Sequence, residues 1–156
     1  CDLLPETVAR LAPHPNVIGI KEALADAGRI QALVALQTED FAVVSGDDPT
    51  ALAAITAGAR GVISVAANVM PGLMAALCDH ALAGRGEEAR ALDAALQGLY
   101  RFLGVESNPI PAKWLCHRLG LCQPRMRLPL TTLTPQWYGE GDQVLADLAQ
   151  LASQAE

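Results

Sequence analysis

Short runs rich in valine and isoleucine alternate with helical segments through the first half of the chain. The runs cover residues 17–23, 41–48 and 61–69, and a segment with apolar residues at helical spacing follows each of them. Consecutive apolar residues of this kind are typical of strands that are buried on both faces. Because strands that alternate with helices form parallel sheets, the pattern predicts an α/β fold with about three parallel strands.

The intervening segments carry signals for helix starts. A helix is predicted at residues 3–12, where a proline stands at an early position. Asp26 is a candidate N-cap for a helix at residues 26–37. Pro49 and Pro71 are predicted to begin two more helices, which run to residues 58 and 84.

The alternation of predicted strands and helices ends after residue 86. Residues 87–103 form one predicted amphipathic helix, and residues 108–121 a shorter one that follows two prolines. A proline-broken extended linker at residues 123–134 precedes a last helix at 135–154. We therefore expect part of a barrel in residues 1–86 and a helical extension in residues 87–156. The leucines on the 87–103 helix suit either a subunit contact or burial within the chain.

Composition excludes several classes of function. The 156 residues carry a net charge of −6 without any basic run, so a nucleic-acid partner is not expected. The longest uncharged run contains a Pro-Gly pair and indicates no membrane span, and we find no signal peptide. A cytoplasmic protein is the simplest expectation.

The four cysteines are Cys1, Cys78, Cys116 and Cys122, and none of them forms a C-x-x-C pair. Their spacing relative to the histidines fits no zinc pattern, so we expect reduced, partly buried thiols and no metal.

The carboxyl ends of the predicted strands carry the residues that could perform chemistry. Lys21 ends the first strand. Burial there would disfavour its charged form, and a neutral amine can attack a carbonyl to form a Schiff base. The alternative is a lysine that extends to solvent or pairs with Glu22 or Asp47.

The second strand ends in Ser45-Gly46-Asp47-Asp48. Gly46 would let a ligand approach the backbone, or it is a turn glycine with positive φ. Asp47 and Asp48 could bind a substrate hydroxyl or ammonium group, or they could cap the helix near Pro49. These residues alone do not decide between the alternatives.

The segments VIGIKEA, SGDD, GARGVISVAANV, NPIPAKWLCHRLGL and RLPLTTL resemble the dihydrodipicolinate synthase family in order and spacing, over nearly the whole chain. The first two are also similar to the wider superfamily of pyruvate-dependent lyases, which includes N-acetylneuraminate lyase and keto-deoxy sugar acid aldolases. The resemblance implies a (β/α)8 barrel with a C-terminal helical extension, and it implies no cofactor.

The resemblance also implies site residues and substrates. Lys21 would be the lysine that captures pyruvate as a Schiff base, and the backbone of Ile63 would lie against the bound pyruvate. Gly46 and Asp47 would lie at the rim near the second substrate, L-aspartate-4-semialdehyde.

The sequence departs from the family in two respects. Leu24 and Ala25 replace the usual Ser/Thr-Gly after KEA, which leaves another pyruvate aldolase as an alternative. A barrel of this type needs about 250 residues, so the chain resembles the C-terminal half. We expect it to form a homo-oligomer or to pair with a complementary N-terminal half. The alternative to an enzyme is a non-catalytic half-barrel assembly module. Alone the chain should turn over negligibly, because the missing acid–base groups contribute roughly 10²–10⁴ in rate and the positioning of the substrates would be lost as well.

Overall fold

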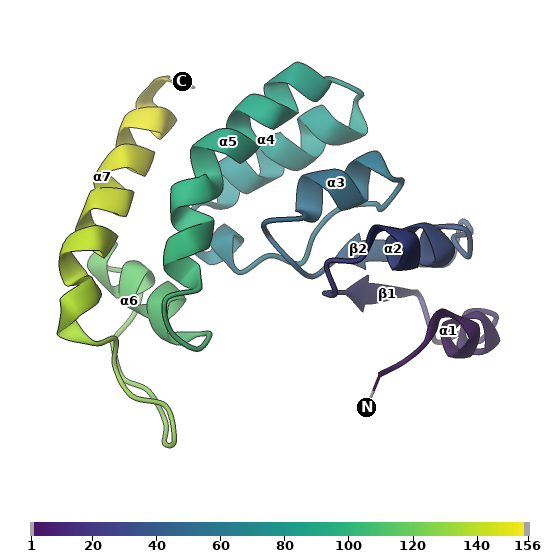
Figure 1. The fold of residues 1–156 in the computed structure, drawn as a ribbon, viewed down its shortest axis with the longest axis horizontal. Coiled ribbons are helices and arrows are strands. Elements are labelled where there is room, and N and C mark those ends of the chain that lie inside the picture. The colour runs from purple at the N-terminus through teal and green to yellow at the C-terminus, as the bar shows by residue number, and fades with distance from the viewer. Residues whose placement is uncertain (1, 155–156) are drawn as a thin grey trace.

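The computed structural model describes residues 2–154, which place two short strands near one end of the molecule and long helices at the other (Figure 1). In chain order the elements are α1 (Pro5–Leu11), β1 (Gly19–Glu22), α2 (Ala27–Val34), β2 (Ala42–Ser45), α3 (Ala51–Thr56), the 3-10 helix η1 (Ala66–Asn68), α4 (Pro71–Leu82), α5 (Gly86–Leu103), α6 (Ile110–Arg118), the 3-10 helix η2 (Pro135–Trp137) and α7 (Tyr138–Gln154).

The sheet is parallel, as predicted. β1 pairs with β2 in a register that runs from Gly19 opposite Ala42 to Glu22 opposite Ser45. Helix α2 makes the crossover between them, and Asp26 caps it by accepting a hydrogen bond from the backbone N–H of Arg29 at 2.7 Å. The α/β architecture and the predicted cap are confirmed.

The prediction of three strands is wrong for the described residues, since the segment at residues 61–69 makes only one bridge, between Ser45 and Val62. The N–H of Ser45 donates to Gly61 and that of Ile63 donates to Ser45, both at 2.8 Å. Beyond that point Asp48 Oδ2 accepts the N–H groups of Val65 and Ala66, and η1 begins. Polar side chains take backbone donors that a longer ladder would have used.

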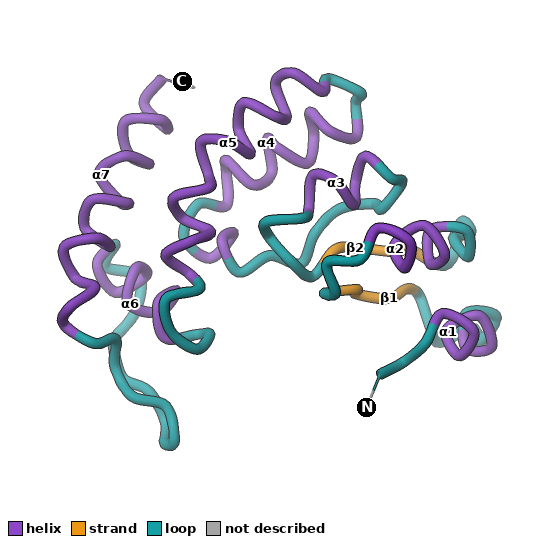
Figure 2. Tube along the Cα trace, in the orientation of Figure 1, coloured by secondary structure: helices purple, strands orange, loops and turns teal. Residues whose placement is uncertain are grey.

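The expectation that the first strand is buried on both faces is also wrong. Along β1 only Glu22 is buried, Lys21 is exposed, and Ile18 just before the strand is 79% exposed. One face of the sheet packs on α1 and α2 through a small core of Val8, Leu33, Phe41 and Val43. By the alternation of the pleat, Lys21 lies on the opposite face, which no helix covers in the described chain. Figure 2 shows the two strands beside the surrounding helices.

The second half folds into the helices that the sequence predicts, with α4 and α5 side by side and α6 and α7 against α5 (Figure 1). Leu96, Leu99 and Phe102 of α5 are almost fully buried in the main core, so the apolar face of this helix is used within the chain. Trp114 of α6 packs on Phe102 and stacks on Tyr138, with ring centroids 6.0 and 5.2 Å apart. These contacts hold α6 firmly in place. Helix α3 begins at Ala51, two residues after the predicted Pro49.

Candidate active site

A cleft of about 500 Å³ lies where the carboxyl end of β1 meets η1 and α6. It brings together two of the predicted site residues, Lys21 and Ile63. The lining residues are Lys21, Ile63, Ser64, Val65, Asn68, Asn108, Pro109, Ala112, Lys113, Cys116, Leu121 and Cys122. The other two predicted residues, Gly46 and Asp47, line a neighbouring cavity of about 220 Å³. Val65 and Asn108 contribute to both cavities, so the two adjoin.

Lys21 lies on the uncovered face of the sheet, and its expected burial is wrong. Its amine makes no hydrogen bond or ion pair with another described residue. The alternative, in which Lys21 pairs with Glu22 or Asp47, is therefore not formed. The amine remains available to a ligand in the cleft.

Gly46 touches the side chain of Lys21. A β-carbon added at Gly46 would lie 2.5 Å from Lys21 Cε, 2.9 Å from Lys21 Cγ and 3.0 Å from the β-carbon of Ala23. Gly46 is not among the glycines with positive φ, so the turn alternative is wrong. The space that Gly46 leaves open is filled by the stem of the lysine.

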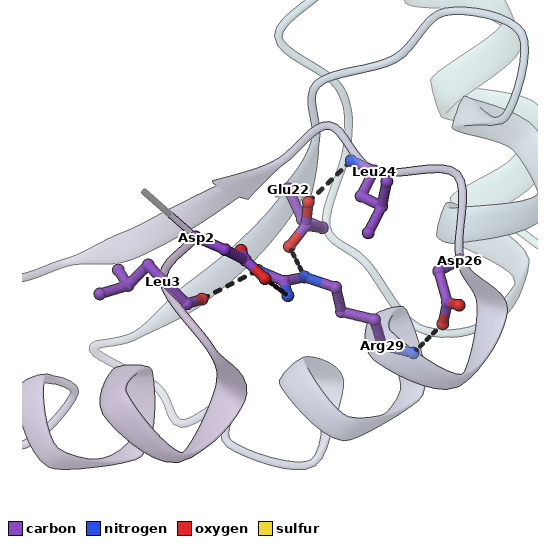
Figure 3. A network of polar contacts seen from close by, with 6 residues as sticks. All are labelled: Asp2, Leu3, Glu22, Leu24, Asp26 and Arg29. Atoms are coloured by element: carbon purple, nitrogen blue, oxygen red, sulfur yellow. Dashed lines mark hydrogen bonds and ion pairs between the residues drawn. The ribbon is translucent and has the colours of Figure 1, made fainter.

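Glu22 faces away from the cleft, into a network that is shown in Figure 3. Glu22 is 7% exposed; one of its carboxylate oxygens accepts from the N–H of Leu24 at 2.7 Å, and the other accepts from Nε of Arg29. The Arg29 guanidinium also binds both carboxylate oxygens of Asp2 and the carbonyl of Leu3. Hydrogen bonds to Glu22 and then to Asp2 raise the pKa of Arg29. The network ties the residues before α1 to the end of β1, and nothing in the sequence pattern indicated it.

Asp47 and Asp48 have different structural partners. Asp47 Oδ2 accepts from the N–H of Thr50 at 3.1 Å and from its hydroxyl at 2.6 Å, so Asp47 closes the turn before α3. Asp48 is 7% exposed and accepts from Val65 and Ala66 at 3.1 and 2.8 Å. Neither carboxylate caps α3, whose N-cap is Thr50 without a side-chain cap: Asp47 holds the preceding turn, and Asp48 binds the backbone at the start of η1.

Ile63 lines the cleft beside Lys21. Its side chain is 55% exposed, and its N–H is already bonded to Ser45. Its carbonyl oxygen accepts no hydrogen bond from the described backbone. Ile63 therefore offers an exposed apolar side chain to a ligand in the cleft, and its carbonyl oxygen has no backbone donor.

The helical half contributes cleft residues that the sequence analysis did not assign to the site, notably Asn108 and Lys113. A signal was present: Lys21 and Lys113 are the only lysines in the 156 residues, and the remaining cationic side chains are arginines apart from the histidines.

The thiols of Cys78, Cys116 and Cys122 are free and half-buried, as predicted, while Cys1 lies outside the described residues. Burial raises the pKa of the Cys78 and Cys116 thiols. Within residues 2–154 no three histidine, cysteine or acidic side chains gather as a metal site would require, and no helix there has the length and apolarity to span a bilayer.

Comparison with known proteins shows the relationships of this chain. The model of the dihydrodipicolinate synthetase family matches residues 1–148. The chain is 49% identical over 151 residues to a 4-hydroxy-tetrahydrodipicolinate synthase of Stenotrophomonas maltophilia, covering 97% of this chain and 50% of that protein. It is 56% identical over 133 residues to the synthase of Acidithiobacillus ferrooxidans, covering 85% and 46%.

Solved structures give the same result. A chloride-inhibited dihydrodipicolinate synthase of Acinetobacter baumannii in complex with pyruvate is 41% identical and superposes with a TM-score of 0.89, over 95% of this chain and 51% of that one. The Thermotoga maritima enzyme is 38% identical with a TM-score of 0.90, over 95% and 52%. The chain spans about half the length of these relatives, in keeping with an α/β structure that is part of a barrel. The chain belongs to the dihydrodipicolinate synthetase family.

Proposed function

We propose that this chain supplies the imine-forming part of a dihydrodipicolinate synthase active site, with Lys21 as the nucleophile. The observation that carries the proposal is the position of Lys21: at the carboxyl end of β1, without a partner for its amine, and in one cleft with Ile63. The A. baumannii relative, whose structure contains pyruvate, supports the choice of a 2-oxo acid as ligand.

The proposed chemistry begins with the neutral amine of Lys21, which adds to the C2 carbonyl of pyruvate. The carbinolamine loses water to give an imine. Loss of a proton from C3 converts the imine to an enamine, and C3 then bonds to the aldehyde carbon of L-aspartate-4-semialdehyde. The aldehyde oxygen takes up a proton to become a hydroxyl group. The amino group of the adduct then bonds to the imine carbon, which closes the ring, and the C–N bond to Lys21 breaks and returns the free amine. The reaction belongs to lysine and diaminopimelate biosynthesis, in the cytoplasm.

The other predicted residues take supporting roles in this proposal. The carbonyl and side chain of Ile63 would border the bound pyruvate. Gly46 leaves room for the stem of Lys21, and Asp47 lies in the adjoining cavity, where the semialdehyde would enter.

We also propose that residues 1–86 are part of a barrel and residues 87–156 are its helical extension. Among residues 2–154 no strand pairs with the outer edge of β1, which leaves backbone groups for pairing. A complementary N-terminal half would occupy that edge, and the complete enzyme would be a homo-oligomer. The chain alone should turn over negligibly, since none of the cleft residues is a tyrosine or a carboxylic acid that could relay protons.

No observation favours a different pyruvate aldolase over the synthase. The departure that suggested one was Leu24-Ala25, and both residues line a cavity between α2 and α3 instead of the cleft of Lys21. The half-barrel assembly role concerns the edge of β1 and is compatible with the enzyme.

Trapping with borohydride tests the proposal. The whole chain is incubated with pyruvate and sodium borohydride, digested and mapped by mass spectrometry. We expect one reduced pyruvate on the peptide that contains Lys21, and none on that of Lys113. A Lys21→Ala chain, checked for folding by circular dichroism, should take up no adduct at that peptide.

Two results would overturn the assignment. One is a folded chain without an adduct at saturating pyruvate. The other is an adduct spread evenly over Lys21, Lys113 and the N-terminal amine, which would indicate random amine reactivity.

A further inference from the structure

Two of the free thiols lie in one wall of the cleft. Cys116 belongs to α6 and Cys122 follows the end of this helix, and both residues line the cleft. Both side chains are half-buried. Cys78, the other free thiol in the described chain, lies on α4 and does not line the cleft. The proposed imine chemistry uses neither Cys116 nor Cys122.

The chain turns back on α6 directly after the helix ends. The N–H of Leu121 donates to the carbonyl of Cys116 at 2.9 Å. Gly120, whose φ is 78°, donates its N–H to the carbonyl of His117 at 2.9 Å. These two hydrogen bonds form a Schellman motif, in which a residue with positive φ reverses the chain. The reversal carries Cys122 back beside the helix, where its carbonyl oxygen lies 3.0 Å from Nδ1 of His117.

The sulfur atoms of the two cysteines lie at the same turn of α6. Cys122 Sγ is 3.7 Å from the carbonyl oxygen of Lys113, which stands three residues before Cys116 and therefore on the same side of the helix. A helical side chain leans toward the N-terminus of its helix, so Cys116 leans over the turn that contains Lys113.

The electrostatics of the two thiols agree with this position. Burial raises the pKa of the Cys116 thiol, and the negative charge that Cys122 carries as a thiolate raises it further. Such an effect falls off with distance, so it requires that the two groups lie near one another. Cys116 and Cys122 are therefore neighbours in space as well as in the sequence.

We infer that Cys116 and Cys122 are a redox-modification site, where a peroxide oxidises the two thiols to a disulfide in the wall of the cleft. This inference goes beyond the proposed function and does not depend on it. Disulfides of proteins in reducing compartments are usually transient and redox-sensing, which is compatible with thiols that are free at rest.

The oxidation has two steps. The thiolate of Cys122 attacks one oxygen of hydrogen peroxide; the O–O bond breaks, hydroxide leaves and takes up a proton to become water, and Cys122 becomes a sulfenic acid. The thiolate of Cys116 then attacks that sulfur; the S–S bond forms, the S–O bond breaks, and the leaving hydroxide takes up the proton that Cys116 released. The two sulfur atoms together lose two electrons, and the peroxide is reduced to two molecules of water. Cys116 suits the second step because its raised pKa makes it a poor first nucleophile.

The disulfide would change the wall of the cleft. The thiol of Cys116 donates to the carbonyl of Asn68 at 3.4 Å, a contact that joins α6 to η1. A disulfide sulfur has no proton to donate, so oxidation removes this hydrogen bond between two elements that both line the cleft. The shape of the cleft should therefore respond to oxidants.

Tryptic mapping tests the inference, because Arg118 lies between the two cysteines. Trypsin separates residues 114–118 from residues 119–125 unless a disulfide holds the two peptides together. The whole folded chain is treated with hydrogen peroxide, the remaining thiols are blocked with N-ethylmaleimide, and the digest is analysed without reduction. We expect the 114–118 and 119–125 peptides as the dominant disulfide-linked pair, and dithiothreitol should release both of them.

Serine variants separate the two thiols. Cys116→Ser leaves the sulfenic acid of Cys122 without a second thiol, so dimedone should capture it there. Cys122→Ser should lose the linked pair and leave Cys116 open to N-ethylmaleimide. Cys78→Ser is the matched control, since Cys78 is half-buried outside the cleft, and it should leave the yield of the linked pair unchanged. Thermal unfolding checks that each variant is folded.

Three results would overturn the inference. One is a folded chain that keeps both thiols free under conditions that oxidise the same chain in urea. Another is the formation of pairs that include Cys1 or Cys78 as readily as the pair of Cys116 with Cys122. The third is a linked pair that occurs only in covalent dimers on electrophoresis without reductant, because the disulfide would then join two chains.

Discussion

Lys21 occupies the space that a side chain on Gly46 would need, so the conformation of the lysine depends on a glycine at the end of the neighbouring strand. The register places Lys21 opposite Val44, and Gly46 follows two residues later on the same face. The stem of the lysine is therefore directed along β2. Because of this contact, the position of the Lys21 amine depends on the absence of a side chain at Gly46, directly after β2.

Gly46→Ala should separate folding from trapping. The new methyl group would meet Lys21 Cε at 2.5 Å, and because this side chain is exposed it can move aside at little cost in stability. We expect pyruvate trapping at Lys21 to fall by about tenfold, as misplacement of a reacting group costs rate steeply. Gly72→Ala is the control, since nothing lies within 4 Å of its β-carbon. Equal trapping in the two variants would show that the contact does not position the amine.

The family resemblance implied that Lys21 and Ile63 border the same ligand, and the two residues share a cleft. Parallel strands end at the same edge of a sheet, which is why residues after two different strands can meet there. The expectation did not need a correct length for the third strand. The helices of the second half, with their strong apolar periodicity, were equally accessible to prediction.

The failures have local causes. Valine and isoleucine content predicted a strand beyond Ile63, but the carboxylate of Asp48, 17 positions before Val65 in the chain, takes the backbone donors there. Burial of Lys21 was inferred from its apolar neighbours, yet burial depends on what covers the sheet, and α1 and α2 cover only one face. The spacing of apolar residues along the sequence does not reveal tertiary partners of this kind.

Asp48 should therefore be important for stability. In Asp48→Ala, two backbone N–H groups at the start of η1 lose their acceptor, and one of them, that of Ala66, is buried. Since each unsatisfied donor costs about 1–3 kcal/mol, we expect a loss of about 2–4 kcal/mol in the free energy of unfolding, measured in urea. Asp47→Ala should lose less, about 0.5–2 kcal/mol, because its carboxylate closes an accessible turn. The reverse order would contradict the assignment of the two roles.

Two glycines of α7 should respond in opposite directions to alanine. A β-carbon at Gly141 would collide with the Trp114 ring and lie 2.6 Å from Phe102 Cζ, both in the main core, so Gly141→Ala should cost about 1–3 kcal/mol. Gly139 has open space around its β-position, and Gly139→Ala should stabilise the helix by up to about 1 kcal/mol. Thermal unfolding of the two variants provides the measurement. A stable Gly141→Ala chain would indicate that α7 can shift away from α6.

Asp93 on α5 should make the protein less stable as pH rises through the acidic range. Burial raises the pKa of Asp93 above its ordinary value of 3.8, and the side-chain amide of Gln97 opposes this only in part. Its Oδ1 is buried without a partner among the described residues. Because the folded protein binds the proton more tightly than the unfolded chain, the stabilisation is complete below the ordinary pKa and is lost above the raised one.

Asp93→Asn should therefore raise the unfolding midpoint at pH 7, and the difference from the unaltered chain should narrow towards pH 3. Glu88→Gln, in the exposed first turn of the same helix, should show no such gain, since a negative charge there favours the helix. A gain for Asp93→Asn that is constant with pH would mean that the carboxyl group does not titrate as its burial implies.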